Sequence, residues 1–117
     1  YAFILQRDYA SAGEAFSEFL QRYPQDKLAG NAQYWLGESY YAQGQYRTAA
    51  DAFLTGYTKY SGGGKAPDSL LKLGMSLQAL GQKEAACASF AEFSQKFPGA
   101  SESMKNRVRA EQKGAGC

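Results

Sequence analysis

The sequence predicts an all-α domain built from repeated, antiparallel helix pairs. Several residue types recur at a step of 37 along the 117-residue chain, and within each unit apolar residues recur at the three- and four-residue spacing of a helix. The residues paired at this step are Ala12, Ala49 and Ala86; Phe16, Phe53 and Phe90; Gly37 and Gly74; and Gly44 and Gly81. A step kept by so many residue types indicates a structural repeat.

The repeat divides the chain into units of two helices each. We expect a truncated first repeat over about 1–26, a second over 27–63, a third over 64–99, a C-terminal helix over 100–113 and a flexible tail over 114–117. The first unit keeps the end of a leading helix and a second helix over 9–23. The second unit has a leading helix through 43 and a second helix over 46–60. In the third unit Leu70, Leu73, Leu77 and Leu80 mark the leading helix, and Ala86, Phe90 and Phe93 mark the second.

Small residues sit where the predicted helices must approach closely. Gly37 and Gly74 mark the crossing of two antiparallel helices, where a side chain would force them apart, and Phe53 and Phe90 fill the space beside the crossing. Gly44 and the equivalent Gly81 can take the left-handed geometry that ends a helix. Pro24 and Pro98 end the second helices, because proline cannot continue a helix.

Composition narrows the classes of function. A net charge of +2 is too mild to indicate nucleic-acid binding, and the basic stretch Lys105, Arg107, Arg109 and Lys113 is typical of a solvated helix face. No apolar run approaches the roughly 20 residues that span a bilayer, so we expect no membrane insertion. The chain opens in mid-pattern, at Tyr1, so its compartment is not read from targeting. Its aromatic content of 15% predicts that some rings lie on a surface that meets a partner.

The two cysteines predict little redox chemistry. Cys87 falls inside a helical pattern, where a free thiol usually behaves as a small core residue, and Cys117 follows a short glycine-rich stretch. We therefore expect free thiols, with a bridge between them as the alternative. With no His and no C-x-x-C motif, neither zinc nor thioredoxin chemistry has its ligands.

Catalysis and cofactors are not expected. The absence of His removes Ser-His-Asp, Cys-His and H-E-x-x-H schemes. The Gly62–Lys65 stretch resembles a phosphate-binding loop, but Lys59 stands where that motif needs Gly and Ala66 where it needs Ser or Thr. We interpret it as a flexible loop between repeats. The acids fall mostly on helix positions facing away from the repeated core, which predicts a solvated face; examples are Glu14, Glu18, Asp51, Glu84 and Glu92.

The motif of the second and third units resembles the tetratricopeptide repeat. The second unit carries Leu36-Gly37-x-x-Tyr40, then Gly44-x-Tyr46, Ala49 and Phe53; the third carries Leu73-Gly74-x-x-Leu77, then Gly81, Ala86, Phe90 and Pro98. The usual unit has about 34 residues, and here three more fall between units. The resemblance implies a right-handed superhelix of antiparallel helix pairs.

Two longer stretches resemble a narrower family. Residues Leu28–Gly44 and Lys65–Gly74 are similar to the C-terminal domain of the YbgF (CpoB) family of Tol–Pal system proteins. The resemblance implies a periplasmic, non-catalytic scaffold that binds TolA and coordinates outer-membrane constriction with septal peptidoglycan synthesis in cell division. It also implies a parent protein that oligomerises through a coiled coil absent from this sequence. The alternatives are the module of an outer-membrane protein assembly lipoprotein, and an accessory domain of an enzyme.

In the repeat that this chain resembles, the leading helices line a concave groove that holds protein segments. The equivalent positions alternate apolar area with polar tips, which suits an extended or helical peptide. They are Asn31, Tyr34, Glu38 and Tyr41 in the second unit and Asp68, Leu71, Met75 and Gln78 in the third, with Tyr1, Ile4 and Leu5 from the first. The alternative is that Tyr34, Leu71 and Met75 only pack between repeats. Trp35 is left open, on the convex side or against a partner, and the same positions lack the basic residues of a carboxylate clamp.

Overall fold

The computed structural model describes residues 8–117, and in this part of the chain α-helices are the regular secondary structure and there is no strand. The helices are α2 (Tyr9–Arg22), α3 (Ala29–Ala42), α4 (Tyr46–Lys59), α5 (Ala66–Ala79), α6 (Lys83–Lys96) and α7 (Glu102–Ala115). The predicted all-α fold class is confirmed. Within residues 8–117 no helix is long and apolar enough to cross a membrane.

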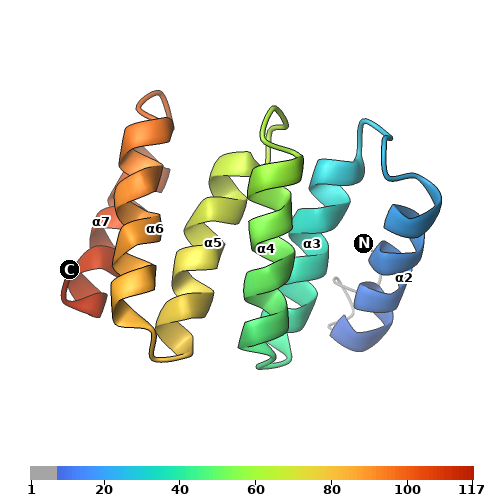
Figure 1. Ribbon diagram of the computed structural model, residues 1–117, viewed down its shortest axis with the longest axis horizontal. Coiled ribbons are helices and arrows are strands. Elements are labelled where there is room, and N and C mark those ends of the chain that lie inside the picture. The colour runs from blue at the N-terminus through green and yellow to red at the C-terminus, as the bar shows by residue number, and fades with distance from the viewer. Residues whose placement is uncertain (1–7) are drawn as a thin grey trace.

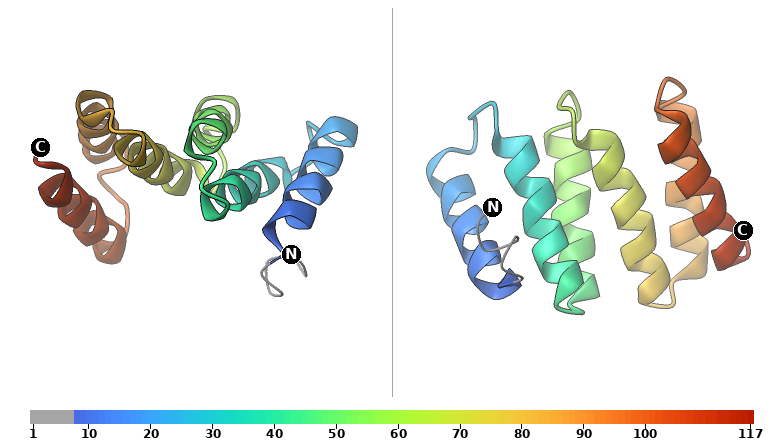
Figure 2. Two further views of the ribbon diagram at one scale, coloured as in Figure 1. Left: turned by 90° about the horizontal axis from the view of Figure 1, so that it is seen from below. Right: turned by 180° about the vertical axis from the view of Figure 1, so that it is seen from behind.

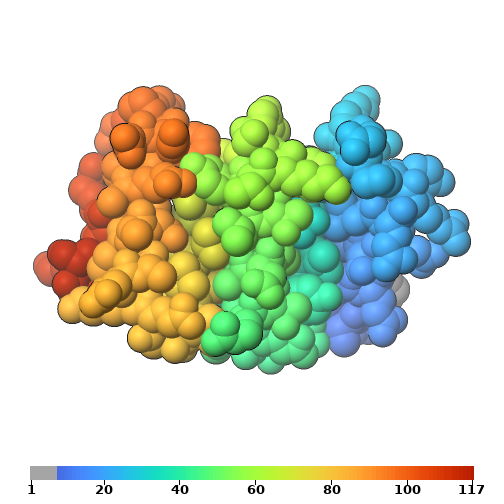
Figure 3. All heavy atoms as spheres, in the orientation of Figure 1, coloured from blue at the N-terminus to red at the C-terminus, as the bar shows by residue number. Residues whose placement is uncertain are grey.

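Consecutive helices run antiparallel and form two layers. Figure 1 views the outer layer, to which α2, α4 and α6 belong; α3 lies between α2 and α4, α5 lies between α4 and α6, and α7 lies behind α6. Figure 2 shows the opposite side, where α3, α5 and α7 face the viewer, and its left panel shows α7 on the inner side of a curved stack. The loops that follow α2, α4 and α6 project from one edge (Figure 3). The inner face therefore belongs to the leading helices.

Each complete unit closes around a glycine–phenylalanine contact. A Cβ atom built on Gly37 would lie 2.5 Å from Cε1 of Phe53, and one built on Gly74 would lie 2.5 Å from Cε1 of Phe90. Both rings are fully buried, as are Ala49 and Ala86 on the same helices as the rings. The structure thus confirms that the crossing leaves no room for a side chain at the two glycines.

Three glycines end α3, α5 and α7 in the same way. Gly44, Gly81 and Gly116 have φ values of 75°, 78° and 75°, in the left-handed region. After α3, the N–H of Gln45 donates to the carbonyl oxygen of Tyr40 at 3.0 Å, which closes a Schellman motif. The N–H of Gly44 also donates, to the carbonyl oxygen of Tyr41 at 3.0 Å. The same two backbone hydrogen bonds recur after α5 and after α7. The predicted left-handed geometry of Gly44 and Gly81 is confirmed.

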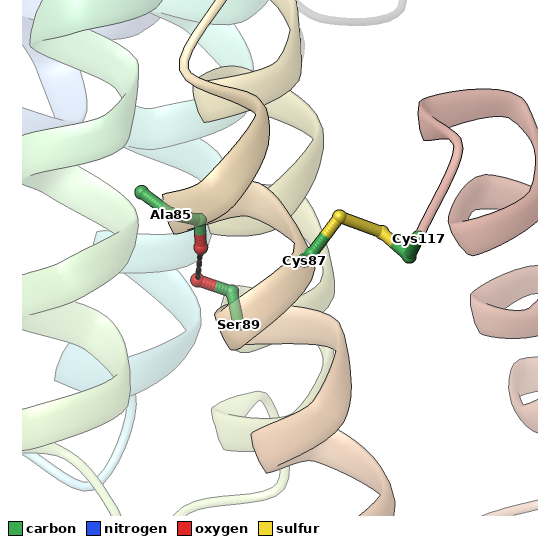
Figure 4. Close-up of a disulfide and its surroundings, with 4 residues drawn as sticks. All are labelled: Ala85, Cys87, Ser89 and Cys117. Carbon is green, nitrogen blue, oxygen red and sulfur yellow. Dashed lines mark hydrogen bonds between the residues drawn. A yellow bond between two sulfur atoms is a disulfide. The ribbon is translucent and has the colours of Figure 1, made fainter.

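The C-terminal end differs from the expectation in two ways. Helix α7 extends to Ala115, and Cys117 is bonded to Cys87 of α6, where we expected a flexible tail over 114–117 and free thiols. Figure 4 shows the disulfide joining the chain end to α6. The cause is Gly116: its left-handed backbone turns the chain back, and the N–H of Cys117 donates to the carbonyl oxygen of Gln112 at 2.9 Å.

Candidate binding groove

The inner layer carries a groove that runs along α5. Helix α3 forms one wall and α7 forms the other. Two hollows, of about 250 and 330 Å³, follow each other along it. We call this surface the α5 groove; it is lined by Tyr34 and Tyr41 from α3, by Asp68, Leu71, Lys72, Met75, Gln78 and Ala79 from α5, and by Ser103, Met104, Arg107 and Glu111 from α7.

The sequence-predicted residues are distributed unevenly over this surface. Tyr34, Leu71 and Met75 are only 8%, 7% and 8% exposed, so they pack between repeats and present only an edge to the groove. Tyr41 and Gln78 are half-buried and line the groove with Asp68, and Glu38 is half-buried beside it. Their burial agrees with the alternative that these three residues pack between repeats, and their contact with a partner stays a prediction.

Other predicted positions lie elsewhere. Asn31 lies on the opposite side of α3, where it lines a different hollow, of about 330 Å³, with Phe16, Phe19 and Trp35. Trp35 is partly buried there, and its ring meets the Tyr34 ring edge-on at 5.2 Å. The predicted positions Tyr1, Ile4 and Leu5 lie outside the described residues.

Sequence reasoning missed the wall formed by α7. The repeat step contained a signal for it: 37 residues after Tyr34 comes Leu71, and 37 after Leu71 comes Val108, which is 1% exposed. Helix α7 therefore takes the place of the leading helix of a fourth unit. Its Arg107 reaches over α5, where Nη2 lies 3.8 Å from the sulfur of Met75, while Nε lies 3.1 Å from the Glu111 carboxylate.

Two lysines of the third unit cover aromatic rings on α3. The Lys72 Nζ lies 5.1 Å from the centroid of the Tyr41 ring and 3.2 Å from Oε1 of Glu38. The Lys65 Nζ lies 5.0 Å from the centroid of the Tyr34 ring and 3.6 Å from the Asp68 carboxylate. These partly exposed cation–π and ion-pair contacts each contribute about 0.5–1 kcal/mol. They fix α3 against α5 and give the groove charges of both signs.

The tyrosines of the groove stay protonated at neutral pH. Burial raises the pKa of the Tyr34 hydroxyl above its ordinary value, and the charges of Glu38 and Asp68 raise it further. Burial also raises the pKa of Tyr41, with smaller contributions from Tyr46 and Glu111. Both phenols are therefore neutral hydrogen-bonding groups at the groove wall.

A larger hollow, of about 460 Å³, lies between α2 and the turn that joins α3 to α4. Its lining includes Glu14, Glu18, Gln21 and Gln43 beside Tyr40. In the described residues no group of three or more His, Cys, Asp or Glu side chains is placed to hold a metal ion. We favour the α5 groove as the candidate site, because three helices converge there and combine apolar floor residues with polar tips.

The repeats decide the family. Residues 1–64 and residues 68–100 each match a family model described as tetratricopeptide repeat. The chain belongs to the tetratricopeptide-repeat family. Such repeats are units of protein–protein interaction scaffolds, and their stacked helix pairs create the extended concave surfaces that these proteins use.

The comparison with curated proteins gives a narrower similarity. Over 41 residues the chain is 54% identical to a protein named cell division coordinator CpoB from Pseudomonas putida KT2440, and to one of the same name from Pseudomonas putida. The match covers 35% of this chain and 15% of the length of each relative. It is consistent with the resemblance seen in the sequence, over a limited part of both proteins.

Proposed function

We propose that this domain binds a peptide segment of another protein in the α5 groove, and that it does so without catalysis and without a cofactor. The observation that carries the proposal is the convergence of α3, α5 and α7 on one hollowed face. There Leu71, Met75 and Met104 supply apolar area, and Arg107 and Gln78 supply polar tips. This combination suits the alternating contacts of a bound peptide.

The proposed setting is the periplasm, within the Tol–Pal system during cell division. The similarity to proteins named cell division coordinator CpoB supports this setting, together with the wider resemblance to the Tol–Pal family. The Cys87–Cys117 disulfide supports an oxidising compartment such as the periplasm. The partner that follows is TolA, with the septal peptidoglycan synthesis machinery acting around it.

Calorimetric titration of the domain with the periplasmic part of TolA tests this proposal. The decisive variant is Arg107→Ala, because this side chain lines the groove and is 52% exposed, so its loss should leave the fold intact. Arg109→Ala is the matched control: Arg109 lies on the same helix, is 61% exposed and is absent from the groove lining.

We expect Arg107→Ala to weaken binding by about 1–3 kcal/mol, as for a central interface arginine, and Arg109→Ala to change it little. Tyr34→Ala is unsuitable as a test of binding, because Tyr34 is buried and its truncation would damage the fold. The centroid of its ring lies 5.8 Å from the centroid of the Phe53 ring. Equal effects of the two arginine substitutions would move the site away from the α5 groove. Absence of binding to the unaltered domain would reject TolA as the partner.

A further inference from the structure

Helix α7 is weakly anchored although it forms a wall of the α5 groove. Its one buried residue is Val108, with Met104 and Ala115 partly buried against the core. The helices α3 and α5, by contrast, each bury several residues. The remaining α7 side chains are mostly charged or polar, and their ion pairs, such as Arg109 with Glu102, lie within α7 itself.

The disulfide stands at a repeat position whose equivalent in the first unit packs against the next leading helix. At the repeat step Cys87 is equivalent to Ala50 and Gly13. Ala50 is buried, and a Cβ built on Gly13 would lie in ordinary contact, 3.6 Å, from Cβ of Ser39 on α3. Gly13 thus packs directly against the following leading helix, α3, whereas Cys87 holds α7 through a covalent bond to Cys117, with 5.5 Å between the two Cα atoms.

The two cysteines differ in exposure. Cys117 is an exposed residue, whereas Cys87 is half-buried on α6. The approach of a thiolate to the disulfide is therefore less hindered on the Cys117 side.

We propose that the Cys87–Cys117 disulfide is a redox clasp: a small-molecule thiol or a protein dithiol reduces it through Cys117, and its reduction releases α7 and removes one wall of the α5 groove. The thiolate attacks Sγ of Cys117, the S–S bond breaks, and the electron pair leaves on Sγ of Cys87, which takes up a proton. A second thiolate attacks the external sulfur of the mixed disulfide and expels the Cys117 thiolate, which is also protonated. Two thiols are oxidised to one disulfide, and the protein gains two electrons and two protons.

The consequence for binding rests on the proposed function of the groove. Met104, Arg107 and Glu111 reach the groove from α7, so a released α7 carries these side chains away together. The floor residues Leu71 and Met75 remain in place on α5. Reduction should therefore weaken peptide binding without unfolding the repeats that precede α7.

Amide hydrogen exchange of the oxidised and the reduced domain tests the release of α7 directly. We expect reduction to raise exchange in α7 at least tenfold, and exchange in α3 and α4 to change less than twofold. The double variant Cys87→Ser/Cys117→Ser should match the reduced protein and should not respond to a thiol. Brief exposure to glutathione followed by peptide mass mapping should place the mixed disulfide on Cys117.

Unchanged protection of α7 after reduction would overturn the proposal, and so would capture of glutathione on Cys87. Calorimetry with the periplasmic part of TolA then measures binding in the groove. We expect the affinity to fall at least fivefold on reduction and to recover on reoxidation. Binding that is indifferent to the release of α7 would also overturn the proposal. No binding by the oxidised protein would reject the proposed partner, and the exchange and mapping results would still decide whether the clasp exists.

Discussion

Replacing Gly37 by alanine tests whether the helix crossing is as tight as the structure shows. The added Cβ would meet three ring atoms of Phe53 at 2.5, 2.6 and 2.8 Å, and the fully buried ring has no room to retreat. Overpacking of this kind costs about 3 kcal/mol, and the better helix propensity of alanine offsets about 1 kcal/mol. We expect a net loss of about 2 kcal/mol in the free energy of unfolding, or about 8 °C in Tm for a chain of this length.

Gly13→Ala is the matched control on α2. Its Cβ would stand 3.6 Å from Cβ of Ser39 and 4.0 Å from Cδ1 of Leu36, which are ordinary contacts, so the propensity gain of about 1 kcal/mol should appear as stabilisation. Urea unfolding followed by circular dichroism measures both variants. Phe53→Leu in the Gly37→Ala background should show a favourable coupling of at least about 1 kcal/mol, because the smaller side chain relieves the contact. A Gly37→Ala variant as stable as the parent would refute this account of the crossing.

Three further perturbations should change the stability of the fold in a defined direction. Ser69→Ala should stabilise the domain by about 1 kcal/mol, because the buried Ser69 Oγ has no hydrogen-bond partner among the described residues. Ser76→Ala on the same helix should not stabilise it, because Ser76 Oγ donates to the Lys72 carbonyl oxygen at 2.8 Å. Equal unfolding midpoints of the two variants would contradict this prediction. The disulfide closes a loop of 30 residues, so removing it should lower the free energy of unfolding by at most about 3.5 kcal/mol, and by less if α7 detaches first. A larger loss in urea titrations would show that the bond supports more than α7. Burial and a hydrogen bond to Glu92 raise the pKa of Tyr57 to about 12, so the unfolded chain loses this proton first and the stability of the fold should fall as pH rises from about 10 to 12. Tyr57→Phe should flatten that decline. An unchanged slope in the variant would contradict this prediction.

The fold could be predicted because the residues that determine it repeat along the chain. Gly37 and Phe53 recur as Gly74 and Phe90, and the contact between them is made within a single helix pair. Such local constraints depend on residue type and spacing, both of which are visible in a sequence. The left-handed glycines that end the leading helices are predictable for the same reason.

The site was only partly predictable because it depends on which neighbours each leading helix has. Helical periodicity placed Asn31 on the same stripe as Tyr34, but α2 and α5 lie on opposite sides of α3 and divide that stripe between two hollows. The α7 wall was missed because its groove residues share no residue type with their equivalents on α5; Arg107, for example, stands 37 residues after Leu70. The disulfide depends on a backbone turn at Gly116 that brings two distant residues together.

The placement of α5 explains why the site and its proposed control fall together. Among residues 8–117, α5 is the leading helix that has a leading helix on both sides, α3 and α7. A groove with two walls forms only at such a helix, because side chains must approach it from both neighbours. Since α7 is anchored by Val108 and by the bond from Cys117, its wall is the less stable of the two. Under the proposed redox control, breaking the Cys87–Cys117 bond therefore alters the groove, while the Gly37–Phe53 and Gly74–Phe90 crossings keep the rest of the stack in place.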